Sequence, residues 1–202
     1  MPPWLSPDRT MPESATLGGS LLILARNAIA TVLDERCRVC DCSPELSRPG
    51  ATFVTITRLG RLRGCIGSLE ARRTLRDDIE DNARAAAFRD PRFVPLTREE
   101  YRDTEIEVSL LSSPEPLPAG SEDETRAMLR PGTDGVVFEF GRSRSTFLPQ
   151  VWEELPDPVQ FLAQLKHKAG LPADFWHGSV RLSRYTVRKW RERAAGQQDG
   201  AA

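Results

Sequence analysis

The sequence is poor in the residues and patterns that usually mark metal, membrane or secreted proteins. It contains only two histidines and four cysteines in 202 residues. Its longest strongly apolar run, LLILA at 21–25, is far too short to cross a bilayer, which takes about 20 apolar residues. The opening MPPWLSPDRTMPESAT lacks the basic start and apolar core of a secretory signal. We therefore expect a cytoplasmic protein without a membrane-spanning segment.

The chain also lacks an excess of charge of either sign. It has 28 basic and 29 acidic residues, so its net charge does not indicate a nucleic-acid or membrane partner. One local exception is a basic stretch near the C-terminus in which Tyr185 and Trp190 are interleaved. The basic residues are Arg181, Arg184, Arg188, Lys189, Arg191 and Arg193. Such a stretch is usually a solvated surface, so we do not expect a nucleic-acid partner, and nucleic-acid binding stands as the third alternative.

Three of the cysteines form a cluster, Cys37, Cys40 and Cys42, with the spacing C-x2-C-x-C. In a chain without an export signal these thiols are expected to be reduced rather than paired in disulfides. The spacing differs from common zinc motifs, and no second Cys or His pair lies nearby. Metal binding and plain thiols both stay open for this cluster. The sequence identifies no cofactor and no metal-ligand set.

Apolar periodicity and turn residues predict helices alternating with hairpins. Helices are expected from Ser20 to about Cys37, over 75–88, at 98–100, from Ser121 to Pro131, and over 157–170. Strands are expected at 51–58, 61–69, 104–111, 134–140, 145–149 and 179–187, followed by a polar segment. Hairpins interspersed with helices predict an α+β fold with largely antiparallel sheets.

Composition also suggests how the chain is divided. Residues 1–18 are rich in Pro, Ser and Gly and are predicted to be disordered. The proline-rich segment 111–121 is the expected joint between two lobes, roughly 19–112 and 113–190. Residues 191–202 are expected to form a polar tail.

The stretch RLRGCIGSL at 61–69 combines two glycines, a thiol and a guanidinium within one expected strand. Side chains alternate along a strand, so Arg63, Cys65 and Gly67 should share one face. The same rule places Glu105 and Glu107 on one face of the strand at 104–111.

A functional interpretation of this face makes Cys65 a nucleophile or redox group, favoured by the neighbouring Arg63. Glu105 and Glu107 would then act as acid and base, while Gly64 and Gly67 let backbone amides approach an anionic ligand. The structural alternative pairs Arg63 with one of the two glutamates and makes Cys65 a small apolar filler.

These residues match a known family. The segments GATFVTITRLGRLRGCIGSLEARRTLRDDIEDNARAAAFRDPRF and LTREEYRDTEIEVSLLSSPEPL resemble the AMMECR-type domain, whose hallmark is L-R-G-C-I-G. The resemblance covers roughly 21–187 and is greatest to the prokaryotic branch called AmmeMemoRadiSam system protein A. It implies one AMMECR-type domain over 19–190, built as two α+β lobes with a cleft between them. It implies no settled activity.

The resemblance places Cys65 in or beside a functional cleft, with Glu105 and Glu107 as further catalytic candidates. The substrate-binding candidates that it implies are Arg63, Gly64, Gly67, Asn82 and Gln150. The name of the branch records genomic association with a Memo-like protein and a radical SAM protein, which are the implied partners. An enzyme acting on a small anionic molecule and a non-catalytic binding or scaffold module both remain open.

Overall fold

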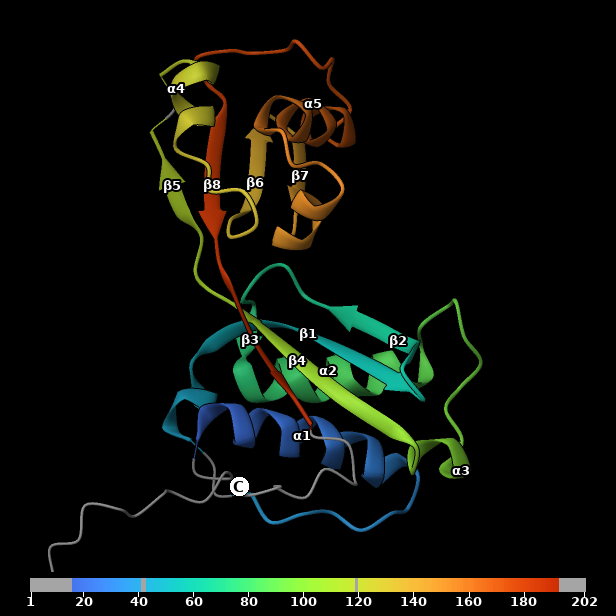
Figure 1. The fold of residues 1–202 in the computed structure, drawn as a ribbon. Coiled ribbons are helices and arrows are strands. Elements are labelled where there is room, and N and C mark those ends of the chain that lie inside the picture. Colours follow the sequence, from blue (N-terminus) through green and yellow to red (C-terminus); the bar gives the residue numbers. More distant parts are fainter. Residues whose placement is uncertain (1–15, 41–42, 119, 193–202) are drawn as a thin grey trace, which may run out of the picture. The chain divides into compact units, whose positions relative to one another are not determined.

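The computed structural model describes residues 16–40, 43–118 and 120–192. The chain divides into two compact units, each of which is described by itself. The first comprises the chain up to Leu110 together with the part from Lys189 onward, and the second comprises Leu111–Arg188. Figure 1 shows the elements of both units.

The first unit is built on a five-stranded sheet with the order β2-β1-β4-β9, in which β3 also pairs with β1. The strands are β1 (Pro49–Arg58), β2 (Arg61–Gly67), β3 (Arg73–Thr74), β4 (Thr104–Leu111) and β9 (Val187–Arg191). The hairpin predicted between β1 and β2 is confirmed, because the two strands pair antiparallel around Leu59 and Gly60. Both turn residues have positive φ, as the tight hairpin turn requires.

Two helices, α1 (Leu17–Val32) and α2 (Leu75–Phe88), lie on one side of this sheet (Figure 1). Thr74 caps α2 by accepting a hydrogen bond from the amide of Asp77. A short helix, α3 (Arg98–Tyr101), begins with the capping box predicted from Thr97 and Glu100. Pro44–Ser47 forms one 3-10 turn. The alanine-rich stripe of α2 and the aliphatic stripe of α1 enclose a single core with the sheet.

Two expectations for the first unit were wrong. Helix α1 is capped by Thr16 and ends at Val32, whereas Ser20 was expected to cap it and Cys37 to end it. Ser20 is buried inside the helix. The polar segment expected after 187 begins with strand β9, and Trp190 of that strand packs against the core of this unit. Residues 1–15 lie outside the described residues, so the disorder predicted for 1–18 can be compared with the structure only at its last three residues. There Thr16 caps α1, and Leu17 and Gly18 belong to the helix.

The second unit holds a four-stranded antiparallel sheet with the order β5-β8-β6-β7. Its strands are β5 (Glu115–Leu117), β6 (Gly135–Phe140), β7 (Ser143–Phe147) and β8 (Arg181–Tyr185). Helices α4 (Glu122–Ala127) and α5 (Pro158–Lys168) and the 3-10 turn Pro149–Glu153 complete it. Trp152 and Phe161 stack in its core with ring centroids 3.7 Å apart. The hairpin predicted around Gly141 is confirmed, and strand β5 within the proline-rich segment was not expected.

Mixed helices and antiparallel strands confirm the predicted α+β fold. Among the described residues, no helix has both the length and the apolar character needed to span a bilayer.

Candidate functional site

The sheet of the first unit has an apolar face and a polar face. Val54, Ile56, Ile106 and Val108 are fully buried in the core that this sheet shares with α1 and α2. The alternating side chains on the opposite side are Thr55, Thr57, Cys65, Glu105 and Glu107, all of them half-buried. The predicted alternation is therefore confirmed for β1 and β4. We call this second side the polar face.

Ion pairs cross the polar face between β4 and β9. A guanidinium nitrogen of Arg191 lies 2.9 Å from Glu105 Oε2, and the same side chain donates to Thr57 Oγ1 at 3.4 Å. Lys189 Nζ lies 3.8 Å from Glu107 Oε1. The cations that face the two candidate glutamates thus come from β9. Sequence reasoning missed them because the basic composition of this strand is typical of a solvated segment.

Arg63 does not follow the strict alternation that would place it on the same face as Cys65. The register between β1 and β2 shifts, so that Ile56 faces Gly64 and Thr57 faces Leu62, which leaves Arg63 as the extra residue of a β-bulge. Arg63 is nine-tenths buried, and its guanidinium donates to Glu100 Oε2 at 2.9 Å and to the Val94 carbonyl at 2.8 Å. The expected ion pair between Arg63 and a β4 glutamate is therefore wrong, because Glu100 takes that place. The predicted roles of Arg63 beside the thiol and in substrate binding stay predictions.

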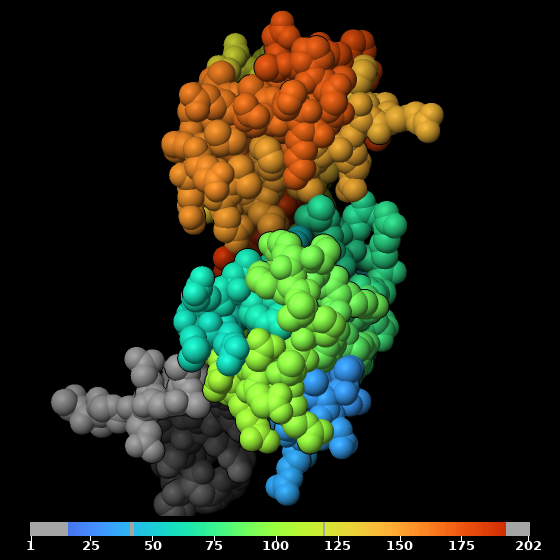
Figure 2. Space-filling model, turned by 90° about the vertical axis from the view of Figure 1, so that its right-hand side faces the viewer, coloured from blue at the N-terminus to red at the C-terminus, as the bar shows by residue number. Residues whose placement is uncertain are grey.

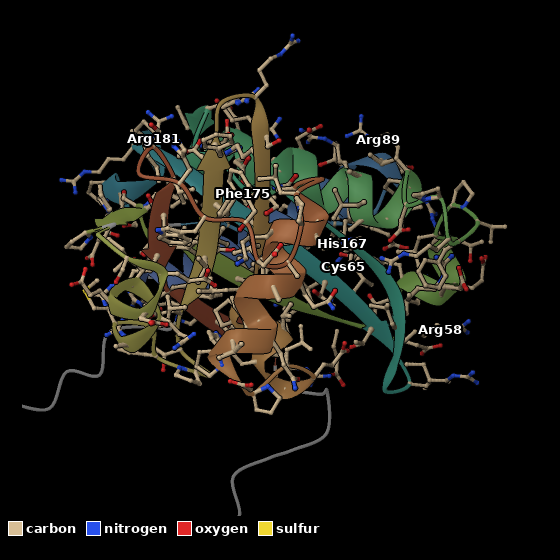
Figure 3. All side chains as sticks on the ribbon, turned by 90° about the horizontal axis from the view of Figure 1, so that it is seen from above. Arg58, Cys65, Arg89, His167, Phe175 and Arg181 are labelled. Atoms are coloured by element: carbon tan, nitrogen blue, oxygen red, sulfur yellow. The ribbon has the colours of Figure 1, made fainter. Side chains whose placement is uncertain are left out.

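The main chain of Cys65 is held by two residues from the segment that follows α2. Its amide donates to Asp90 Oδ2 at 2.9 Å, and its carbonyl accepts from Arg92 Nη2 at 3.2 Å. Its Sγ lies 3.3 Å from Thr55 Oγ1 on the neighbouring strand. Figure 3 labels Cys65 on β2. In Figure 2 the segment after α2, coloured light green, lies beside the turquoise β1–β2 hairpin. The cation next to this cysteine is accordingly Arg92.

Asp90 is the anion at the centre of this arrangement and is only 5% exposed. Hydrogen bonds from the Arg92 side chain, joined by the amides of Cys65 and Arg92, hold the pKa of Asp90 well below its ordinary value despite burial. Its carboxylate is therefore ionised at neutral pH. Asp90 acts here as a hydrogen-bond acceptor rather than as a proton donor.

The two glycines of the motif are explained by close packing. A Cβ on Gly64 would lie 2.1 Å from the carbonyl oxygen of Ala86 in α2. A Cβ on Gly67 would lie 2.2 Å from the ring of Phe53 and 2.6 Å from the carbonyl oxygen of Thr52. Bare Cα positions are needed for these contacts whether or not a ligand binds. Their role as ligand-binding amides stays a prediction.

Asn82 belongs to a buried polar network that joins α2 to β1. Its Nδ2 donates to the carbonyl and hydroxyl oxygens of Thr52 at 3.0 and 3.1 Å, and to Asp78 Oδ2 at 2.9 Å. These bonds occupy the amide and indicate a role in the fold. Gln150 lies exposed in the 3-10 turn Pro149–Glu153 of the second unit, so its predicted ligand role stays a prediction.

Metal ligands are not assembled in the described part of the chain, which contains no group of three His, Cys, Asp or Glu side chains arranged to hold an ion. Cys37 is exposed and its Sγ lies 3.5 Å from Thr31 Oγ1, while Cys40 is half-buried. Cys42 lies outside the described residues. Both alternatives for the three-cysteine cluster therefore stay open.

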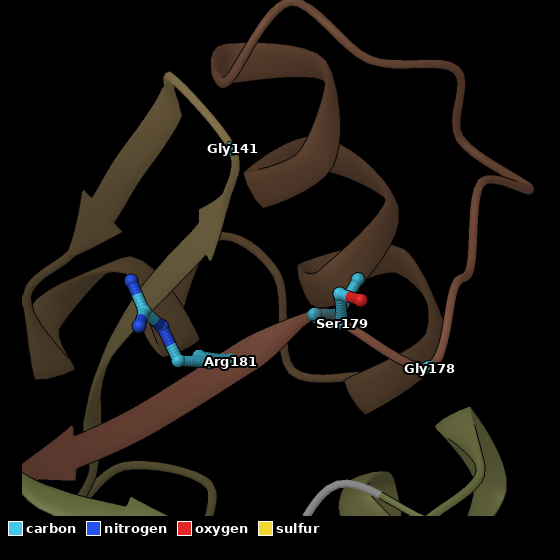
Figure 4. Close-up of a pocket in the computed structure, with 5 residues that line it drawn as sticks. Gly141, Gly178, Ser179 and Arg181 are labelled. Atoms are coloured by element: carbon cyan, nitrogen blue, oxygen red, sulfur yellow. The ribbon is translucent and has the colours of Figure 1, made fainter.

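One hollow of about 460 Å³ lies in the second unit (Figure 4). It is lined by Gly141, Gly178, Ser179, Val180 and Arg181. Nearby, the Ser179 amide donates to Nδ1 of His177 at 3.0 Å, which fixes the loop before β8. This hollow was not singled out from the sequence, and it offers neither a carboxylate nor a thiol.

Comparison with known proteins places this geometry in a family. The AMMECR1 family model matches residues 22–190. A protein of Methanothermobacter thermautotrophicus is 38% identical over 186 residues, which cover 90% of this chain and 97% of the relative. A protein of Thermofilum pendens is also 38% identical, over 85% of this chain and 88% of its own length.

Among solved structures, the crystal structure of an uncharacterised protein from Pyrococcus horikoshii matches with a TM-score of 0.73 and 33% identity. The match covers 90% of this chain and 95% of that one. These findings confirm the AMMECR-type resemblance that the L-R-G-C-I-G segment indicated. The chain belongs to the AMMECR1 family.

Proposed function

We propose that the polar face around Cys65 binds a small anionic molecule and acts on it, with Cys65 as the nucleophile or redox group. Glu105 or Glu107 would serve as the acid and base. One observation carries the proposal: both backbone groups of Cys65 are held by a charged pair, while its thiol is half-buried on the polar face. A cysteine that only fills space in a core needs neither feature.

The charges around the thiol support an anionic ligand. Arg92 has a half-exposed side chain and already contacts the Cys65 carbonyl. Lys189 and Arg191 add two partly exposed cations on the same face, although each pairs with a glutamate. Both histidines of the sequence, His167 and His177, belong to the second unit. Within the first unit, the proposal assigns the thiol proton to a carboxylate of β4, which β1 separates from β2.

A second candidate is a binding or scaffold module, which one further observation favours. Leu59, Leu62 and Val94 are exposed by 79%, 46% and 74%, and all three lie in or next to the β1–β2 hairpin. If the protein is an AmmeMemoRadiSam system protein A, its partners would be a Memo-like protein and a radical SAM protein. Docking through these side chains would survive Cys65→Ser and fail in Leu62→Glu and Val94→Glu variants.

Nucleic-acid binding gains no support from the side chains that suggested it. Tyr185 is buried and Trp190 packs against the core of the first unit, so neither ring is free to stack on a base. Lys189 and Arg191 face glutamates of β4. We do not propose this function.

The proposed site predicts where small anions bind. Titration of inorganic phosphate, acetate and succinate should shift the amide resonances of Cys65 and its β1 neighbour Thr55 saturably. Arg92→Gln should weaken that binding roughly tenfold, the cost of losing one charge-assisted contact. Arg89→Gln is the matched control, since Arg89 lies on the same segment and pairs with Asp81 instead.

Two results would count against the site. Equal weakening by both arginine variants would show that Arg92 has no specific role in anion binding. Shifts confined to the hollow around Ser179 would place the anion site in the second unit.

A further inference from the structure

We infer that Asp90 and Arg92 are positioning residues for Cys65, which fix its main chain and set the charge beside its thiol. We call this pair the Asp90–Arg92 clamp. The inference deepens the proposed function and rests on Cys65 being its reactive group. It concerns the thiol itself, so it is tested without any substrate.

The clamp occupies a place where a neighbouring strand would otherwise pair. Strand β2 is at the edge of its sheet, and edge strands present unpaired N–H and C=O groups. At Cys65 the amide is taken by a carboxylate oxygen of Asp90 and the carbonyl by a guanidinium nitrogen of Arg92. One residue of the edge is thereby satisfied on both sides by two side chains. This fixes the Cys65 backbone as a further strand would.

The clamp is itself anchored, so its geometry is set before any ligand arrives. Arg92 donates to Asp90 through Nε at 2.9 Å and through Nη2 at 2.7 Å, and its amide donates to Asp90 Oδ1 at 3.1 Å. The following residues are tied back, because the Phe93 amide donates to the Asp90 carbonyl and the Leu96 amide donates to the Ala87 carbonyl of α2. The clamp therefore moves with α2, against which Gly64 packs.

The clamp also brings two charged groups into hydrogen-bond contact with the Cys65 main chain. Strand β1 contributes the uncharged Thr55. The carboxylates of β4, Glu105 and Glu107, face Arg191 and Lys189 of β9, and Arg63 of β2 itself is paired with Glu100 of α3. Arg92 favours the thiolate and Asp90 opposes it. Replacing Arg92 and replacing Asp90 should therefore shift the pH dependence of thiol alkylation in opposite directions.

The test is the pH dependence of iodoacetamide alkylation at Cys65 in the full-length protein. Trypsin releases Cys65 in the peptide 64–72, which contains no other cysteine, so mass spectrometry follows this thiol alone. We call the pH at which the alkylation rate reaches half its maximum the midpoint. Arg92→Gln should raise this midpoint by roughly 0.5 pH unit, and Asp90→Asn should lower it by a similar amount, which is the usual effect of a nearby, partly exposed charge. Arg92→Lys should stay near wild type, as should the control Arg89→Gln.

A merely structural clamp would give a different result, because both substitutions would loosen β2 and speed alkylation at every pH. Midpoints that shift in the same direction, or that do not shift, overturn the inference. Should Asp90→Asn fail to fold, Arg92→Gln against Arg92→Lys decides, since equal midpoints for these two also overturn it. Failure of anion binding at the polar face leaves these midpoints unchanged, so the two proposals fail separately.

Discussion

Replacing Gly64 by alanine is expected to destabilise the first unit by about 3 kcal/mol, because the new methyl group has no space. Its Cβ would lie 2.1 Å from the carbonyl oxygen of Ala86 and 3.0 Å from the carbonyl carbon. Both are backbone atoms of α2, so relief requires the helix and β2 to move apart. Hydrogen exchange at amides of β1 and α2 measures this loss in the first unit alone.

Two other glycines provide controls for Gly64→Ala. A Cβ on Gly178 meets nothing within 4 Å, and we expect Gly178→Ala to be nearly neutral. Gly60 also has open space but a φ of +75°, so Gly60→Ala should cost about 1 kcal/mol through backbone strain. A Gly64→Ala variant that is no less stable than Gly60→Ala would contradict the close approach of β2 to α2.

Replacing Asp78 by alanine should cost about 3–4 kcal/mol, since it leaves several buried donors without an acceptor. Asp78 Oδ2 accepts from the amide and the hydroxyl of Thr52 at 2.8 and 2.7 Å and from Asn82 at 2.9 Å. Its Oδ1 accepts from Ser68 Oγ at 2.7 Å and from Arg73 Nε at 3.0 Å. One carboxylate thus ties α2 to β1 and to the segment between β2 and β3.

The neighbouring Asp77 is the matched control for this substitution. It is the same residue type in the same first turn of α2, but it is exposed and accepts from Thr74 Oγ1. Asp77→Ala should therefore cost about 1 kcal/mol or less, the usual value of a capping interaction. Equal losses of amide protection for the two variants would refute the network around Asp78.

Elements with one strongly buried face could be predicted from the sequence. Buried aliphatic side chains of β1 and β4 alternate with half-buried polar ones over 54–57 and 105–108. Shifting β4 by one residue would bury Glu105 and Glu107. The starts of α2, α3 and α4 were marked by Thr74, Thr97 and Ser121, whose side chains accept from the backbone as expected. These signals are local, so neighbours in the sequence suffice to find them.

The features that the sequence did not predict have a common cause, because each depends on contacts between residues that are distant in the sequence. The basic composition of β9 is typical of a solvated segment, although its pairing with β4 gives Lys189 and Arg191 acidic partners. The bulge at Arg63 has no compositional mark, yet it directs that side chain to Glu100. No periodicity could show that Arg92 lies beside Cys65 instead.

The central claim is that the Cys65 thiol stands at the polar face and is available for chemistry in the folded protein. The direct measurement is the rate of Cys65 alkylation in native protein, compared with the exposed Cys37 in the same sample. We predict modification of Cys65 without unfolding, at a rate within about tenfold of Cys37 and independent of low denaturant concentrations. Modification of Cys65 only at the rate of global unfolding would contradict the claim and leave this thiol as part of the core.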